Sequence, residues 1–488
     1  MKFARSCPPV AHISVRYIIA GLGPIMIVDR EVRKGRSAIF EGNVLGAQRA
    51  ARSRSIVVVG SGYVGLTLSA CLAQLGHEVE CTDSSASRVG ELAQGRVPVV
   101  EEGLTELVGQ MLVSGRLRFG TGNARAAAQA EFVFLCLPTP SAADGGADLS
   151  FVEAVAVEIG PALRPGATVV TKSTVPVGTG EMLERAIDRS DVHVASNPEF
   201  LAEGTALRDC LYPDRIVVGA RSDDVARNVA DLYGSADDSQ LVLTDLASAE
   251  LIKYASNAYL ATRLTFVNSM AEICEAAGAD IRSVMTGMGS DHRIGTAFLR
   301  PGPGWGGSCL PKDTHALVET AERLGCDLAL IKAAIAENAH HNRRVVAKVA
   351  RALDDDVSGK RVAVWGLTFK AGTDDLRDSP ALEIARRLGE LGASVQAYDP
   401  TVPQGTVPGI EVHSSALSAA HQADALIIAT EWPEFASADL AALAAAMRGR
   451  VLIDARNLLD AATATGEGFA YSGTGTPAFE KRTSEVAA

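Results

Sequence analysis

Residues 55–83 read SIVVVGSGYVGLTLSACLAQLGHEVECTD, and this stretch decides the fold of the first part of the chain. An apolar, β-branched run leads into the turn Gly60-Ser61-Gly62-Tyr63-Val64-Gly65, and an apolar helical pattern follows. A second strand pattern then ends at Asp83. A strand, a glycine-rich turn, a helix and an acid in this order predict a βαβ unit that binds a dinucleotide.

Each glycine of this turn has a different structural role. Gly60 permits the tight turn, Gly62 lets the backbone approach a pyrophosphate, and Gly65 allows the helix to pack closely against the strand. The first helical residues, Tyr63 and Val64, lie where N–H donors and the positive end of the helix dipole meet the phosphates. We therefore expect all five residues to contribute to the cofactor site.

The acid that ends the second strand bears on which dinucleotide is bound. Asp83 can accept hydrogen bonds from the adenosine ribose hydroxyls and would repel a 2′-phosphate, which favours NAD over NADP. Arg88, five residues further on, weakens this preference. NAD is the predicted cofactor.

Composition excludes several classes of partner. The chain has 488 residues and a formal net charge of −12, so its long-range field repels nucleic acid and anionic membranes. The apolar run 17–28 contains Gly and Pro and falls short of the ~20 residues that span a bilayer. The eight cysteines include no CxxC pair, which indicates neither a disulfide framework nor a metal site. We expect no metal and a reduced, cytoplasmic setting.

Strand and helix patterns divide the chain into two α/β parts with a helical part between them. Strands alternate with helices from residue 55 to about 244 and again from residue 361, whereas long helical patterns fill the middle. We predict an α/β fold in which two Rossmann-like, doubly wound domains are joined by a central helical domain. The expected divisions are a poorly ordered N-terminal extension (1–54), an NAD-binding domain (55–244), the central domain (245–354), a C-terminal Rossmann-like domain (355–465) and a mobile tail (466–488).

The segment PGPGWGGSCLPKD (301–313) indicates covalent chemistry. Its glycines expose backbone amides around Cys309 and leave the thiol little apolar packing, whereas the other cysteines fit the usual buried and inert class. Pro311 can begin a helix just beyond it. A thiol at a helix N-terminus beside Lys312 is expected to have a lowered pKa, so that more nucleophilic thiolate is present at neutral pH.

Eight motifs follow one another between residue 55 and about residue 472: GSGYVG, CLPTP, KSTVPVGT, SNPEFLAEGTA, ELIKYASNAYLATR, GSDHRIGTAFL, PGPGWGGSCLPKD and LTFKAGTDDLRDSPA. In these motifs the chain resembles the UDP-glucose/GDP-mannose dehydrogenase family. The resemblance implies an NAD-dependent, four-electron oxidation of a nucleotide sugar, with UDP-glucose as expected substrate and UDP-glucuronate as product. Cys309 would capture the aldehyde as a thiohemiacetal, which is oxidised to a thioester and released as the acid by water.

The resemblance also assigns catalytic roles by matched motif. Cys309 would be the nucleophile, and Lys253 with Asn257, four residues apart on one helix face, would hold the developing oxyanions. Asp313 and Thr174 would position a water or assist proton transfer.

Two glutamates of NPEFLAE complete this set. Glu199 is a candidate base for thioester hydrolysis, and Glu203 is expected beside the cofactor. Which carboxylate takes which proton stays open, because coupled groups share their titration. An isolated lysine or glutamate most often belongs to a solvated helix face, but Lys253 lies in an otherwise apolar helical pattern.

Further residues match family positions that contact one of the two ligands. Those expected at the cofactor, besides the glycine-rich turn, are Thr139, Thr174, Glu203, Lys312 and Arg377. Those expected at the nucleotide sugar are Glu199, Phe200, Leu201, Lys253, Asn257, Arg293, Phe298, Arg300, Gly306, Phe369, Lys370 and Arg456. Arg300 stands where a lysine is often found, which keeps the charge and changes the hydrogen-bond geometry.

The resemblance implies a homodimer that uses the central helices, because the arginine of the DHRIG motif, here Arg293, can reach a neighbouring subunit's site. GDP-mannose or a UDP-hexosamine are alternative substrates. SCLPKD differs from the HCIPVDP-type segment of the N-acetylhexosamine branch, which weakens that alternative, while GDP-mannose stays open. A non-catalytic nucleotide-binding homologue would have lost the cysteine or lysine, and a two-electron hydroxyacid dehydrogenase needs no cysteine.

Overall fold

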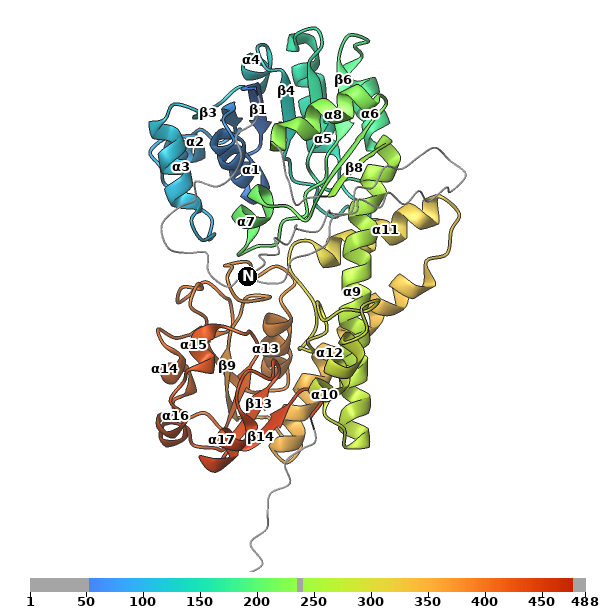
Figure 1. Cartoon of the computed structure of the whole chain (residues 1–488). Coiled ribbons are helices and arrows are strands. Elements are labelled where there is room, and N and C mark those ends of the chain that lie inside the picture. Colours follow the sequence, from blue (N-terminus) through green and yellow to red (C-terminus); the bar gives the residue numbers. More distant parts are fainter. Residues whose placement is uncertain (1–51, 235–239, 477–488) are drawn as a thin grey trace, which may run out of the picture.

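The computed structural model describes residues 52–234 and 240–476, so most of the expected N-terminal extension lies outside the described residues. Two sheet-containing domains occupy opposite ends of the molecule, and one long helix runs along the side that joins them (Figure 1). The predicted α/β architecture with a helical central domain is confirmed. Among the described residues, no helix combines the length and apolar character that a membrane crossing requires.

The N-terminal domain contains, in its described residues, an eight-stranded sheet in the order β3-β2-β1-β4-β5-β6-β7-β8. Neighbouring strands pair in parallel, apart from the antiparallel pair β6–β7. The strands are Ser55–Val59 (β1), Glu78–Thr82 (β2), Leu117–Gly120 (β3), Phe132–Leu135 (β4), Thr168–Thr171 (β5), His193–Ser196 (β6), Arg215–Ala220 (β7) and Gln240–Thr244 (β8). The helices are Tyr63–Gln74 (α1), Ala86–Leu92 (α2), Leu104–Val113 (α3), Asn123–Ala127 (α4), Ser150–Ile159 (α5), Thr179–Ile187 (α6), Ala206–Leu211 (α7) and Asp223–Ala230 (α8).

Helices cover both faces of this sheet, so its central strands are buried on both sides. Every residue of β4 and β5 is buried, as expected of near-continuous apolar runs in a parallel sheet. The strand order reverses between β1 and β4, and in open parallel sheets ligands bind beyond the carboxyl ends of the strands at such a switch point.

The central domain consists of Leu246–Ala277 (α9), Ile281–Gly289 (α10), Leu310–Arg323 (α11) and Ala329–Ala352 (α12). Asp245 caps the start of α9 by accepting the Ser248 N–H at 2.8 Å, and Gly278, with φ of 72°, ends it in the left-handed conformation. Both α11 and α12 pack on α9. The 32 residues of α9 therefore form the support on which the rest of this domain is placed.

The C-terminal domain contains a six-stranded sheet within the described range, in the order β11-β10-β9-β12-β13-β14 with parallel pairing. Its strands are Arg361–Trp365 (β9), Ser394–Tyr398 (β10), Glu411–Val412 (β11), Ala425–Ile428 (β12), Val451–Asp454 (β13) and Ala470–Gly473 (β14). Its helices are Pro380–Glu390 (α13), Ala416–Ala420 (α14), Pro433–Ala436 (α15), Leu440–Ala446 (α16) and Ala461–Gly466 (α17).

The prediction of a mobile tail from residue 466 is wrong for the described residues up to 476. β14 pairs with β13, and Tyr471 is buried and donates a hydrogen bond to Asp454 at 3.1 Å. This stretch is rich in Gly, Ser and Thr, so its sequence does not indicate a strand. The short edge strand is ordered by pairing with its neighbour rather than by a pattern of its own.

Candidate functional site

Four of the predicted catalytic residues meet where α9 passes the start of α11. Lys253 and Asn257 lie one turn apart on α9, and both are buried. Cys309 is the N-cap residue of α11, and Asp313 on the first turn of that helix is fully buried. The Asn257 side-chain N–H donates to Asp313 at 2.6 Å, which joins the two helices beside the thiol.

Glu199 reaches this centre from the N-terminal sheet, just beyond β6. Its carboxylate lies 2.8 Å from the Lys253 ammonium, and the two side chains are 6% and 4% exposed. Its other oxygen accepts the Leu201 N–H at 2.6 Å, and the Phe200 ring lies 5.5 Å from the same ammonium. Burial alone would raise the pKa of Glu199, but the charge of Lys253 holds it below its usual value. The carboxylate is therefore ionised at neutral pH.

Lys253 remains charged in spite of its burial. Burial lowers the pKa of this ammonium, but the surrounding acidic groups, with Glu199 first and Cys309 and Asp313 after it, raise it above its usual value. A buried cation thus faces a thiol and two carboxylates. Such a cation can stabilise an oxygen that becomes negative during a reaction.

The expected lowering of the pKa of Cys309 is wrong. Burial raises the pKa of this thiol, and the negative charges of Glu199 and Asp313 add to the effect, whereas Lys253 opposes it. The neighbouring Lys312 does not help in the expected way, because its ammonium binds Asp313 at 2.5 Å. The thiol is therefore protonated at neutral pH, and its proton must pass to a base when the sulfur attacks.

Glu203 of the N-terminal domain is hydrogen-bonded to both of the other domains. It accepts a hydrogen bond from Ser308 of the central domain at 3.0 Å and one from Thr373 of the C-terminal domain at 2.7 Å. Burial raises the pKa of Glu203, and the nearby Asp375 contributes in the same direction. Ser308 and Thr373 were not predicted, since nothing local to either residue indicates a partner more than 100 positions away.

The glycine-rich turn fits a pyrophosphate. Gly60 has φ of 101°, and a Cβ there would lie 2.3 Å from the Cys136 carbonyl oxygen. A Cβ on Gly65 would lie 1.9 Å from the Gly60 carbonyl oxygen, whereas a Cβ on Gly62 would have no atom within 4 Å. Gly62 is also the N-cap of α1 and provides no side-chain cap, so the first N–H groups of this helix are left for a ligand.

Residues around this turn are already hydrogen-bonded to one another. The Asp83 carboxylate accepts from the Ser61 N–H at 3.1 Å and the Ser61 hydroxyl at 2.6 Å. Burial would raise the pKa of Asp83, but these bonds, one from Ser85 and the charge of Arg88 bring it below its usual value. Asp83 is therefore an ionised acceptor, as a ribose contact requires.

The other residues expected at the cofactor lie in both the N-terminal and the C-terminal domain. The Tyr63 hydroxyl bonds to Glu101, and Val64 packs against the apolar core. Thr139 beyond β4 donates to the carbonyl of Thr174 beyond β5 at 3.0 Å. Arg377 pairs with Asp375 at 2.7 Å in the C-terminal domain.

The C-terminal domain packs against the loop that carries Cys309. A Cβ on Gly306 would lie 2.0 Å from the Asp378 carbonyl oxygen, and one on Gly307 would lie 2.8 Å from the Phe369 ring. Only glycine permits these approaches, which bring the loop onto the segment with the predicted nucleotide-sugar residues.

Two of the predicted cations, Arg456 and Lys370, lie next to Phe369. Arg456 donates to the Phe369 carbonyl at 3.1 Å and to the Ala429 carbonyl at 2.9 Å, and it pairs with Glu431 at 3.0 Å. The Lys370 ammonium lies 5.5 Å from the Phe369 ring. Carbonyl bonds hold the Arg456 guanidinium in one orientation, as recognition of a phosphate requires.

Three residues predicted to contact the nucleotide sugar lie outside the buried reaction centre. Arg293 is 77% exposed and pairs with Asp291 of its own loop at 2.5 Å. Phe298 is 45% exposed with φ of 56°, and Arg300 is exposed as well. These side chains are available to a ligand or to a second chain.

A buried lysine behind Glu199 was missed. Lys172 is 6% exposed and donates to Asn197 at 3.0 Å and to the Tyr233 hydroxyl at 2.9 Å. Burial lowers the pKa of Lys172, whereas nearby Cys210, Cys136 and Glu199 raise it in part. The signal that could have revealed it is a lysine at the end of the apolar strand run TVVTK.

Known proteins match this chain in all three of its domains. The UDP-glucose/GDP-mannose dehydrogenase family matches in three parts: its NAD binding domain at residues 54–237, its central domain at 247–340 and its UDP binding domain at 363–461. The chain belongs to this family. It is an NAD-dependent dehydrogenase, and the predicted cofactor NAD is confirmed.

Named relatives and a solved structure align over most of the chain. The UDP-glucose 6-dehydrogenase of Rhizobium meliloti (strain 1021) is 44% identical over 86% of this chain and 99% of its own length. The UDP-glucose 6-dehydrogenase of Pseudomonas aeruginosa is 40% identical over 86% of this chain and 97% of its own. A UDP-glucose dehydrogenase structure from Pyrobaculum islandicum has a TM-score of 0.81 at 37% identity and covers 88% of this chain and 99% of its own.

Proposed function

We propose that this protein oxidises UDP-glucose to UDP-glucuronate in two steps at one site, with Cys309 as the covalent attachment point. The observation that carries the proposal is the thiol at the start of α11 beside the buried Lys253–Glu199 ion pair. A soft nucleophile, a fixed cation and a base are the groups required for capture of an aldehyde and hydrolysis of the resulting thioester. The substrate is inferred from the relatives that carry the name UDP-glucose 6-dehydrogenase.

NAD⁺ supplies the hydride acceptor for both oxidations. In the first, the alcohol passes its O–H proton to a water positioned by Asp313 while the Lys253 ammonium stabilises the oxygen. The Cys309 sulfur then bonds to the aldehyde carbon, and the S–H proton ends on the carbonyl oxygen to give a thiohemiacetal. A second oxidation of that carbon leaves a thioester.

Release requires water to attack the thioester carbon. Glu199, ionised and 2.8 Å from Lys253, is the base that we assign to this water. The C–S bond breaks, the sulfur recovers its proton, and the acid leaves. The covalent adduct keeps the aldehyde bound and restores a carbon that can lose a second hydride, which explains why a cysteine is needed.

The yield of NADH tests this scheme. We expect two NADH for each UDP-glucose consumed, and one would reject the four-electron reaction. GDP-mannose and a UDP-N-acetylhexosamine, assayed in parallel, should have much lower kcat/KM. A Cys309→Ser variant should accumulate a blocked or very slow intermediate, because an oxygen ester is not equivalently reactive. Unimpaired turnover by this variant would exclude the covalent route.

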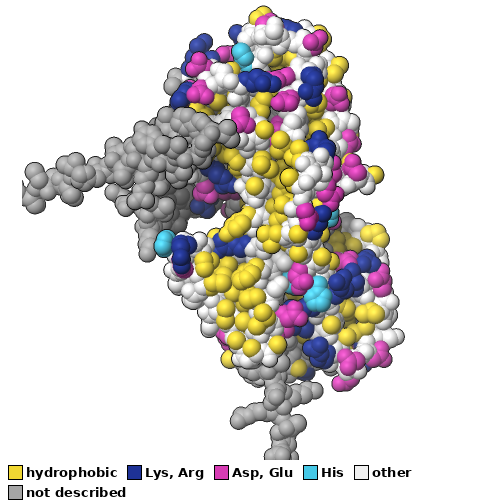
Figure 2. All heavy atoms as spheres, turned by 90° about the vertical axis from the view of Figure 1, so that its right-hand side faces the viewer, with side chains coloured by type: hydrophobic (Ala, Val, Ile, Leu, Met, Phe, Trp, Pro, Cys, Tyr) yellow, Lys and Arg dark blue, Asp and Glu magenta, His cyan; other side chains and the backbone are white. Residues whose placement is uncertain are grey.

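We further infer a cytoplasmic homodimer that forms through α9. Apolar side chains on this helix are exposed at intervals of seven or eight residues, namely Leu251, Tyr259, Phe266 and Ile273. Figure 2 shows hydrophobic side chains gathered along the middle of the face on which α9 lies. A continuous exposed apolar patch of this kind is typical of a protein interface. The exposed Arg293 is assigned to the partner's site.

Mixing two inactive variants tests the assignment of Arg293. If Arg293→Ala and Cys309→Ala chains exchange into mixed dimers, one site of each mixed dimer carries both changes and the other carries neither. An equal mixture should then regain about a quarter of the wild-type activity, since half of the dimers are mixed and each has one intact site. If Arg293 acts within its own chain, the mixture stays inactive.

A further inference from the structure

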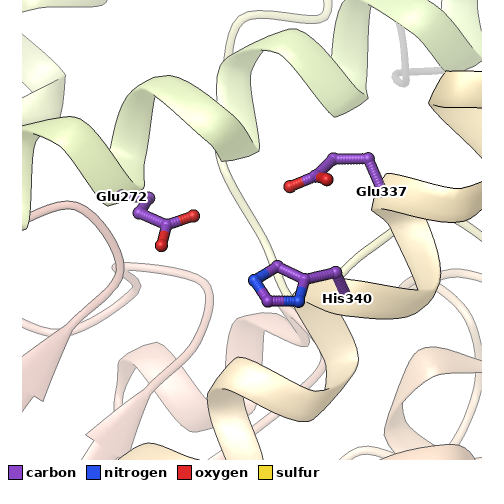
Figure 3. A group of neighbouring side chains, drawn as sticks. All are labelled: Glu272, Glu337 and His340. Atoms are coloured by element: carbon purple, nitrogen blue, oxygen red, sulfur yellow. The ribbon is translucent and has the colours of Figure 1, made fainter.

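We propose that Glu272, Glu337 and His340 form a binding site for a divalent ion of the zinc class, which links α9 to α12. Each residue offers one ligand atom, and the three atoms lie within 4.8 Å of one another. Figure 3 shows Glu272 extending from α9 and the other two side chains extending toward it from α12. The cysteine pattern predicted no metal site, and this site uses no cysteine.

The site is separate from the reaction centre. Glu272 lies 19 positions after Lys253 on α9, which at ~1.5 Å per residue is about 28 Å along the helix axis. None of the three residues contacts the groups around Cys309 that the reaction uses. A ligand at this position would therefore act on the central domain rather than on the chemistry.

The three side chains at this site make few hydrogen bonds or ion pairs with the rest of the protein. Within the described residues, Glu337 has no hydrogen bond or ion pair, and His340 has only an edge contact with His341 at 6.4 Å between ring centres. Glu272 pairs with Arg344 at 3.1 Å through one oxygen, which leaves its second oxygen available. Two carboxylates and an imidazole thus converge with one neighbouring cation, and a bound dication would remove the repulsion between the acids.

The spacing of the ligands suits an ion held between two helices. Glu337 and His340 are three residues apart on α12 and so share one face, an arrangement used for metal ligands in helical bundles. Zinc bonds to carboxylate and imidazole are ~2.0–2.2 Å, so the ligand atoms must approach to roughly 3.3 Å of one another. Rotation about the terminal side-chain bonds is sufficient for this approach, and water completes the coordination.

The choice of ion follows from the donors. A neutral imidazole with two carboxylates favours Zn²⁺ and its first-row neighbours over Mg²⁺ or Ca²⁺, which take oxygen ligands. Because the ligands come from two helices, the ion would stabilise the folded central domain by binding it in preference to the unfolded chain.

Zinc titration of the full chain, prepared without a metal-binding tag, tests the site. The titration uses a Cys309→Ala background, because a cysteine thiolate can itself bind zinc. We expect one Zn²⁺ per chain, with affinity reduced by roughly tenfold or more in His340→Ala and in Glu337→Gln. His292→Ala is the matched control, since that imidazole is 94% exposed and lies outside the cluster.

Thermal unfolding provides the second measurement. Zinc should raise the unfolding midpoint of the background protein and of the His292 variant, and should raise that of the His340 variant much less. In chains that retain Cys309, His340→Ala should leave turnover without added metal unchanged. Equal zinc affinity in the His340 variant and the background protein, or the absence of a stoichiometric site, would overturn the proposal.

Discussion

Replacing Lys253 by Met tests the ion pair at the centre of the site. The change removes the ammonium that lies 2.8 Å from Glu199 and leaves a carboxylate that is only 6% exposed without its cation. Breaking a buried pair in this way costs about 3–5 kcal/mol of stability. Loss of the oxyanion-stabilising charge should also reduce kcat by about 10²–10³.

The stability loss should depend on pH in a defined direction. In the wild type the pKa of Glu199 lies below its usual value, so the pair stabilises the fold at neutral pH and loses this effect as pH falls through that pKa. In the variant, burial without the ammonium raises the pKa of Glu199, so protonation relieves the cost at mildly acidic pH. The difference between the two proteins should therefore narrow from pH 8 to pH 5.

Urea unfolding at both pH values, together with steady-state kinetics, measures these effects. A Lys253→Met/Glu199→Gln double variant should recover most of the lost stability and none of the activity. Lys332→Met is the matched control, since its side chain is 42% exposed and its surface ion pairs should contribute little to stability. A single variant as stable as the wild type, or a double variant no more stable than the single one, would refute the reasoning.

Two further predictions concern the buried Lys172 near Glu199 and the glycine-rich turn of the cofactor site. Lys172→Met should move the acidic limb of the kcat/KM profile to higher pH, because the Lys172 charge helps to lower the pKa of Glu199; an unchanged profile would exclude this influence. Gly65→Ala should lower the unfolding midpoint, since its Cβ would lie 1.9 Å from the Gly60 carbonyl oxygen. Gly62→Ala should leave the midpoint nearly unchanged and raise KM for NAD⁺, because its Cβ would point into the open space before the helix; the reverse ranking would contradict the assignment of the turn.

Elements with strong local patterns were predictable. The strand that runs into Gly60 and the helix that begins beside Pro311 both appear at the expected positions. Apolar periodicity, glycine and proline act on the chain within a few residues, so one sequence window contains the whole cause. Short edge strands such as β3, β11 and β14 were not predicted, because pairing with neighbours supplies most of their order.

The sequence by itself determined which chemical groups the site contains: a thiol in a glycine-rich loop, a lysine and an asparagine one helical turn apart, and an acid after a buried strand. Tertiary structure decided their state. Glu199 pairs with Lys253, and Cys309 is a half-buried, protonated thiol rather than a thiolate. The reason is physical: a pKa depends on solvent exclusion and on every charge within several ångströms, and those neighbours come from distant parts of the chain.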